Sequence, residues 1–217
     1  MNYFYAIIFE DDHIIIANKP AGIPVQPDKT SDQSFMTSIE KGAMQPLFLI
    51  NRIDRPASGL VLFAKDKGTA AKLSNMLAIG KIEKTYLAVV GQKPDLSKGK
   101  LVHHLRKESK SNRSFAFNKP LHHTKKAILE YRVLASIERY HLIEVQLGTG
   151  RHHQIRAQFG AIGSPIKGDV KYGFRRGNRD RSIHLHAWKL RFRHPLRNEI
   201  IEAEAPIPQD TVWANLT

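Results

Sequence analysis

Short apolar runs and, farther along the chain, alternation of apolar and polar residues predict a chain built mainly of β-strands. FYAIIFE at residues 4–10 and HIIIANK at residues 13–19 form the first expected pair, joined by an acidic turn at Asp11-Asp12. Similar patterns predict further strands at residues 60–64, 85–90, 127–134, 140–147, 184–192 and 200–204.

Helical spacing is confined to three stretches. It is weak at residues 33–44 and clearer at residues 69–79, before Gly80, and at residues 152–162, before Gly163. Because strands outnumber helices and do not alternate with them regularly, we expect an α+β fold with a mixed, mainly antiparallel β-sheet core and flanking helices. The length of 217 residues fits one globular domain, or a compact double lobe around one cleft.

The net charge of the chain indicates the kind of partner that it binds. The chain has 34 Lys+Arg against 20 Asp+Glu, a net charge of +14 and a pI near 10.0. Such a basic protein attracts a polyanion, with nucleic acid as the first candidate and an anionic membrane as the second. No basic amphipathic helix favours the membrane.

Two basic stretches are where we expect this partner. Residues 91–126 predict loops and short strands that face a polyanion, and residues 171–181 predict a second basic loop. Composition alone is equally consistent with solvated loops. The phenylalanines in these stretches could stack on bases or anchor the loops to the core; they are Phe115, Phe117 and Phe174.

Residue types and segments that the sequence lacks exclude several kinds of site and location. The chain has no cysteine, so disulfides, thiolate nucleophiles and Cys-ligated zinc are excluded. The N-terminal sequence lacks the features of a signal peptide, and no apolar run approaches the length of a membrane span. We therefore expect a soluble, cytoplasmic protein.

A carboxylate between two arginines is the sharpest local feature. Asp54 lies between Arg52 and Arg55, in a turn with proline and glycine just before a predicted buried strand. Flanking positive charge keeps an aspartate ionised, and an ionised aspartate on a rigid loop is a candidate nucleophile or base. An aspartate that accepts hydrogen bonds from turn amides or surface arginines would have the same local sequence.

A second feature is the run TGRHHQIR at residues 149–156. Its glycine breaks a strand, and basic residues open the predicted helix, where anions are normally favoured. Arg151 and His152 should therefore face a carboxylate or phosphate from elsewhere. If both residues are helical, His152 and Arg156 share a face, from which Arg156 could reach a buried carboxylate such as Asp54. Ordinary surface arginines are the alternative.

Tyr86 opens the apolar strand in EKTYLAVV at residues 83–90. A tyrosine there can pack its ring and still present its hydroxyl, although most such tyrosines are structural.

Taken together, these motifs resemble the RluA-type pseudouridine synthases. NRIDRPASGLVLFAK at residues 51–65 is similar to the family signature HRLDxxTSGLLLxAK, and TGRHHQIRAQ is similar to its GRTHQIRxH helix. Matching segments occur in the family's order from about Phe9 to Pro206; they are ANKPAGIPVQP, EKTYLAVV, IKGDVKYG and LHAWKLRFRHP. The resemblance implies one catalytic domain, residues 1–217, without the S4-like N-terminal domain of many relatives.

The resemblance also implies roles for individual residues. Asp54 matches the catalytic aspartate, Tyr86 the active-site tyrosine, and Arg156 the basic partner of the catalytic carboxylate. Arg52 matches an arginine that helps to fill the space left by a flipped base. We expect RNA contacts from the following residues: Arg52, Arg55, Arg151, His152 and Lys19.

Four residues depart from the family pattern. Asn51 replaces the usual His, Ala57 the usual Thr, Gln158 the final His, and His152 a common Thr. These departures leave the catalytic trio intact but put in doubt which RNA is recognised and how the site is supported.

The implied activity is the isomerisation of specific uridines in structured ribosomal or transfer RNA. The base is flipped into a central RNA-binding cleft, the bond from C1′ to N1 is cleaved, and uracil is re-attached through C5. Attack of Asp54 on C1′ and a glycal route remain open alternatives. No cofactor or metal is expected, nor any membrane, and we expect a monomer.

Two other functions fit parts of this sequence. A non-catalytic RNA-binding module would have the same charge but no need for Asp54, Tyr86 and Arg156 together. A metal-dependent nuclease or hydrolase is suggested by 11 histidines, but their adjacent pairs lack HExxH or comparable ligand spacing.

Overall fold

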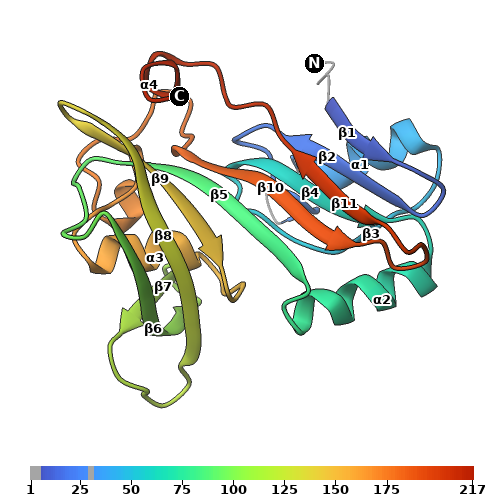
Figure 1. Cartoon of the computed structure of the whole chain (residues 1–217), viewed down its shortest axis with the longest axis horizontal. Coiled ribbons are helices and arrows are strands. Elements are labelled where there is room, and N and C mark those ends of the chain that lie inside the picture. The colour runs from blue at the N-terminus through green and yellow to red at the C-terminus, as the bar shows by residue number, and fades with distance from the viewer. Residues whose placement is uncertain (1–5, 29–31) are drawn as a thin grey trace. The chain divides into compact units, whose positions relative to one another are not determined.

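The computed structural model describes residues 6–28 and 32–217 (Figure 1). Phe4 and Tyr5 of the first predicted strand lie outside the described residues. The chain forms two compact units, Met1–Lys84 with Ala187–Pro206, and Thr85–His186 with Ile207–Thr217. The single catalytic domain over residues 1–217 stays a prediction.

The first unit is a sheet with two helices. Its strands are β1 (Ala6–Glu10), β2 (Ile14–Lys19), β3 (Phe48–Leu49), β4 (Ser58–Ala64), most of β10 (Leu185–Arg193) and β11 (Ile200–Glu204). Their order is β1-β2-β4-β10, with β3 paired to β4 and β11 to β10. The pairs β1–β2, β2–β4, β3–β4 and β10–β11 are antiparallel. Its helices are α1 (Phe35–Ala43) and α2 (Lys67–Ala78).

The strands β2 and β4 are buried on both faces, and alternate side chains of each strand form one core cluster of this unit. Ile14 and Ile16 of β2 and Leu60 and Leu62 of β4 are fully buried in this cluster, together with Leu73 of α2. Burial of an aliphatic side chain contributes about 1.5–3 kcal/mol, so the cluster holds β4 firmly against β2 and α2.

Helix α2 begins two residues before the predicted start at residue 69. The carboxylate of Asp66 accepts hydrogen bonds from the backbone nitrogen of Thr69 at 2.8 Å and from its hydroxyl at 2.6 Å, which caps the helix. The helix ends at Ala78, and Gly80 follows with a positive φ of 74°, as the predicted C-terminal glycine requires.

The second unit is a five-stranded antiparallel sheet in the order β5-β9-β8-β6-β7. The strands are β5 (Ile82–Val90), which begins in the first unit, β6 (Lys98–Glu108), β7 (Arg113–Phe117), β8 (Lys125–Ile137) and β9 (Tyr140–Leu147). Helix α3 (Gln154–Ala161), the short 3-10 helix η1 (Val170–Tyr172) and α4 (Thr211–Ala214) complete it. Figure 1 shows α3 behind the β6–β7–β8 strands, and α3 packs on β6 and β7.

Helix α3 covers one face of the β6–β7–β8 sheet. Leu105 of β6 and Ala127 of β8 are buried in a cluster with Ala157 of α3 and Tyr172 of η1. The alternate side chains of the same strands point away from α3 and are mostly exposed.

The architecture confirms the predicted α+β class with a mixed, mainly antiparallel sheet. Residues 91–126 were expected to form loops and short strands, but β6 is a strand of 11 residues. Helix α3 begins at residue 154, later than predicted, because His153 has a left-handed backbone with φ 52°. Therefore His152 lies before the helix, and the prediction that it shares a helical face with Arg156 is wrong.

Candidate active site

Asp54 lies in the loop between β3 and β4. The side chain of Asn51 attaches this loop to β4. The buried Asn51 accepts a hydrogen bond from the backbone nitrogen of Leu62 at 2.7 Å and donates to the carbonyl of Leu60 at 3.3 Å. Ile50 adds a backbone hydrogen bond to Leu62 at 3.0 Å. Asn51 thus replaces the usual histidine with a group that both donates to and accepts from β4.

The turn that holds Asp54 is closed by its own backbone. The carbonyl of Asp54 accepts a hydrogen bond from the nitrogen of Ala57 at 3.0 Å, and the Asp54 side chain is half-buried. Gly59 then enters β4 with φ 112°, and a Cβ atom there would lie 2.3 Å from the carbonyl oxygen of Ala187. Only glycine fits at this position of the motif.

Lys19, which was expected to contact RNA, is fully buried beneath this loop. Its Nζ donates to the carbonyls of Pro20 at 2.8 Å, Ile23 at 2.9 Å and Arg55 at 3.3 Å. Burial lowers the pKa of Lys19 to about 7; the Asp54 carboxylate opposes this shift and Arg55 adds to it. This placement makes Lys19 a support of the Asp54 loop, and the ammonium is not on the surface where a phosphate could reach it.

The two arginines beside Asp54 differ in their surroundings. Arg52 is exposed. Arg55 donates through Nε to the carbonyl of Gly22 at 2.9 Å and forms ion pairs with Asp28 and Asp32. Arg55 therefore joins the loop after β2, which contains Gly22, to the Asp54 loop, and nearby carboxylates offset part of its charge.

Tyr86 is buried in β5, directly opposite Val145 of β9. Its position on an apolar strand confirms the expected strand, while its role beside a target base stays a prediction.

Arg156 forms a buried two-point ion pair that the sequence did not reveal. Its Nε lies 2.6 Å from Oδ2 of Asp169 and its Nη2 lies 2.9 Å from Oδ1, and both residues are almost fully buried. The guanidinium also lies 5.0 Å from the ring centroid of Tyr172. These contacts fix the orientation of the Arg156 side chain. The motif GDVKYG contains Asp169 and Tyr172, but nothing in the spacing identified Arg156 as their partner.

Asp54 belongs to the first unit, whereas Tyr86 and Arg156 belong to the second. The expected pairing of Arg156 with Asp54 and the central RNA-binding cleft therefore stay predictions.

His152 and His153 are stacked before α3, with ring centroids 3.7 Å apart. The hydroxyl of Ser114 donates to the His152 carbonyl at 2.8 Å and contacts His152 Nδ1 at 2.9 Å. The Tyr172 hydroxyl contacts His153 Nδ1 at 2.9 Å and accepts from the Ser114 nitrogen at 2.7 Å. Strand β7 is thereby tied to the start of α3.

Two further motif residues have distinct surroundings. Arg151 is exposed, and its Nε donates to the carbonyl of Lys126 at 3.0 Å. Gln158, which stands where the family has histidine, is buried and donates to the carbonyl of Leu101 at 3.2 Å. Gln158 therefore attaches α3 to β6.

Within residues 6–28 and 32–217, no group of three or more His, Asp or Glu side chains is arranged to hold a metal ion. No helix in the same residues is long and apolar enough to span a membrane.

Known proteins match both the sequence and the fold. The RNA pseudouridylate synthase family matches residues 13–161. The chain is 33% identical to the uncharacterised RNA pseudouridine synthase YhcT of Bacillus subtilis, over 94% of this chain and 69% of that protein. It is 31% identical to tRNA pseudouridine synthase C of Vibrio cholerae, over 97% and 93%, and 31% identical to ribosomal large subunit pseudouridine synthase D of Zymomonas mobilis, over 94% and 69%.

A solved structure agrees with these sequence matches. Human RNA pseudouridylate synthase domain containing 1 superposes with a TM-score of 0.79 at 21% identity, covering 94% of this chain and 84% of that one. The fold is thus that of pseudouridylate synthase domains, and the order of motifs is that of the RluA type. The chain belongs to the RNA pseudouridylate synthase family.

Proposed function

We propose that this RNA pseudouridine synthase isomerises specific uridines in ribosomal or transfer RNA, with Asp54 as its catalytic carboxylate. The observation that carries the assignment is the support of the Asp54 loop: Asn51 fixes it to β4, and Lys19 binds the carbonyl of the next residue, Arg55. A loop held from two sides suits a carboxylate that must meet one atom of a flipped nucleotide.

In the proposed reaction, uridine leaves the base stack and enters the site before chemistry begins. The bond between C1′ and N1 breaks, uracil rotates, and a bond forms between C1′ and C5. C5 then loses a proton and N1 gains one, so the change is an isomerisation with no net redox step.

Asp54 has one of two roles. It attacks C1′ to form a covalent sugar ester, or it takes part in the removal of the C2′ proton that leads to a glycal. In both routes the carboxylate must be ionised. Arg156 is proposed to be the basic partner of this carboxylate and to orient it.

Tyr86 is proposed to pack against the target base and to accept the proton from C5. Arg52, which is exposed beside Asp54, is proposed to fill the space left by the flipped base. Arg55, Arg151 and His152 are proposed to contact the RNA backbone.

The substrate class rests on the relatives. Their names specify transfer RNA for one and large-subunit ribosomal RNA for another. Total RNA from a host that lacks this gene therefore offers both classes to the wild-type protein and to Asp54→Asn. Pseudouridines are then mapped as reverse-transcription stops after carbodiimide treatment.

New stops with wild type that are absent with Asp54→Asn would support the proposal and identify the RNA. If both proteins add the same sites, Asp54 is not the catalytic carboxylate. If neither adds a site although both bind RNA, a binding module replaces the enzyme. We also propose a monomer in the cytoplasm, for which light scattering and cell fractionation are direct tests.

A further inference from the structure

The exposed face of the β7–β6–β8 sheet carries aromatic and basic side chains in adjacent rows. Phe115 of β7 lies opposite Arg106 of β6, and Phe117 lies opposite His104. His104 in turn lies opposite Lys126 of β8. Opposed residues of antiparallel strands project from the same face, so these side chains form one surface, here called the β7 platform.

The aromatic rings of the β7 platform are accessible. Phe115 is 37% exposed, and Phe117 is half-buried. Phe174, the third phenylalanine of the basic stretches, differs because its ring covers Gly91, where a Cβ atom would come within 2.6 Å of it. Phe174 therefore anchors a loop, whereas Phe115 presents its ring to solvent.

Guanidinium groups accompany both rings. Arg113 lies 5.4 Å from the centroid of Phe115, and Arg106 lies 5.1 Å from that of Phe117. In the described part of the chain, neither arginine forms an ion pair with a carboxylate. Arg106 is exposed and therefore remains available to neutralise a phosphate. Arg113 is half-buried, and its guanidinium also lies 5.4 Å from the ring centroid of Tyr172, so it mainly supports the Phe115 ring.

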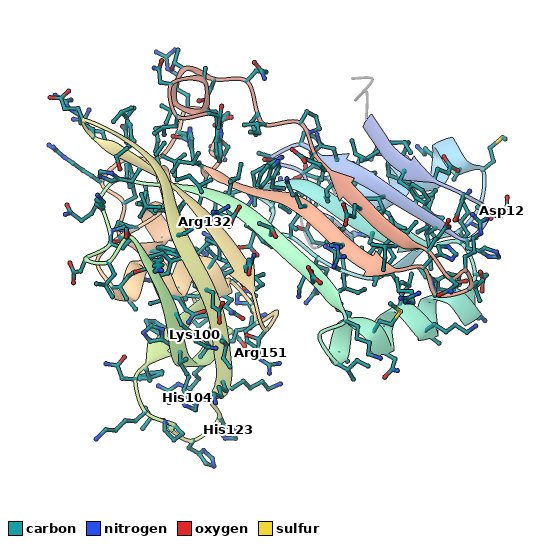
Figure 2. All side chains as sticks on the ribbon, viewed as in Figure 1. Asp12, Lys100, His104, His123, Arg132 and Arg151 are labelled. Carbon is teal, nitrogen blue, oxygen red and sulfur yellow. The ribbon has the colours of Figure 1, made fainter. Side chains whose placement is uncertain are left out.

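The charge of this surface is uneven along the strands. Lys100 forms an ion pair with Glu130 at 3.0 Å and Arg132 binds Glu144 at 2.8 Å, so the acidic residues are matched at that end. Toward β7, Figure 2 shows His104 beyond Lys100 along β6, with Arg151 beside them. Arg151 is anchored to this sheet by its hydrogen bond to the carbonyl of Lys126.

We propose that the β7 platform binds an unpaired segment of the substrate RNA by stacking its bases on Phe115 and Phe117. Aromatic rings interspersed with cations match the alternation of bases and phosphates in a single strand. A duplex offers phosphates but hides the faces of its bases, so the platform discriminates single strands from duplexes.

The platform lies apart from the residues proposed for chemistry in the same unit. Arg156 is on α3, which covers the opposite face of the β6–β7–β8 sheet. The inference rests on the proposed function for its substrate, but it assigns a second contact outside the pocket for the target uridine.

The test uses a labelled oligoadenylate of about eight nucleotides, within the roughly 4–16 nucleotides that single-strand sites cover. This probe contains no uridine, so its binding does not depend on catalysis. Phe115→Ala should raise its Kd by about 5- to 100-fold, the range for loss of one stacked base. Phe115→Leu should raise the Kd as much as Phe115→Ala does. Phe115→Trp should retain the affinity of the wild type and show fluorescence quenching on binding.

Two controls separate stacking from general effects. Ile200→Ala removes a similarly exposed side chain on β11 of the first unit and should leave the Kd unchanged. On blunt duplex RNA, Phe115→Ala should change the Kd little, whereas Lys126→Gln should lower the salt dependence of binding to the single strand by about one phosphate contact.

An oligoadenylate Kd within about twofold of wild type for Phe115→Ala overturns the platform. An equal loss on single-stranded and duplex RNA also overturns it, because stacking requires unpaired bases. If the wild type forms pseudouridine while Phe115→Ala binds oligoadenylate normally, only this inference fails. If no pseudouridine forms but the aromatic substitutions weaken binding as described, the proposed function fails and the platform stands.

Discussion

The Nζ atom of Lys19 lies 3.3 Å from the carbonyl oxygen of Arg55, the residue directly after Asp54. One buried cation thus connects the end of β2 to the loop that carries the proposed catalytic carboxylate. Because the same ammonium also binds the carbonyls of Pro20 and Ile23, it holds the two loops in one arrangement.

Lys19→Met should destabilise the protein and slow its reaction. The carbonyls that Lys19 now binds would lose a buried donor, at a cost of about 1–3 kcal/mol in the free energy of unfolding. Urea unfolding measures this change, and kcat should fall because the Asp54 loop loses its support. Lys72→Met, at an exposed position of α2, is the matched control. A variant as stable and active as that control would contradict this role for Lys19.

The pKa of Lys19 makes stability depend on pH in a defined direction. Burial lowers that pKa from 10.5 to about 7, so between these values the unfolded chain binds more protons than the folded one. Its contribution to stability therefore increases as pH rises from about 7, by at most about 1.4 kcal/mol per pH unit. Unfolding free energies of wild type minus Lys19→Met, measured from pH 7 to 9, should rise; a flat or falling difference would refute the assignment.

Asp169→Asn should be strongly destabilising because it removes one carboxylate from a two-point ion pair in which both side chains are almost fully buried. Breaking one side of such a pair costs about 3–5 kcal/mol. Arg132→Gln breaks an ion pair with Glu144 in which the arginine is exposed, and should cost under about 1 kcal/mol. Thermal unfolding compares the two variants, and similar small shifts for both would show that the Arg156 pair contributes little.

Substitutions of Asn51 should separate its two hydrogen bonds. Asn51→Leu leaves the nitrogen of Leu62 and the carbonyl of Leu60 unpaired, which costs about 1–3 kcal/mol, and should lower kcat. Asn51→Asp retains the acceptor for Leu62 and should lose less stability. Urea unfolding and single-turnover pseudouridine assays provide the readouts, with Asn75→Ala on exposed α2 as reference. Equal stability of Asn51→Leu and the reference would rule out this support.

The sequence predicted most strands because their patterns are local. The cap of Asp66 on α2 is also local, yet the start at residue 67 was missed because the apolar spacing begins only at residue 69. Helix α3 was predicted too long because nothing in the run of two histidines indicates a left-handed His153. Local patterns identify an element better than they place its ends.

Contacts between residues that are distant in the sequence could not be predicted from local patterns. Lys19 reads as a surface cation in sequence, and only the fold places it under the Asp54 loop. The pair of Arg156 with Asp169 joins a helix to a later loop, and in sequence Arg156 fits a phosphate site as well as an ion pair. Tertiary contacts decide whether a charged side chain binds a phosphate or forms an ion pair within the protein.

Gly59 would have a distinctive signature in a saturation-mutagenesis library. Every other side chain would meet the backbone of Ala187 and require a strained φ, so all nineteen replacements should be depleted together. Neighbouring Asp54 should instead tolerate substitutions when cells are selected for folded protein and reject them when selected for modified RNA. Mutational tolerance under two selections would thus distinguish a glycine required for strand packing from an aspartate required for the proposed reaction, although both belong to one short motif.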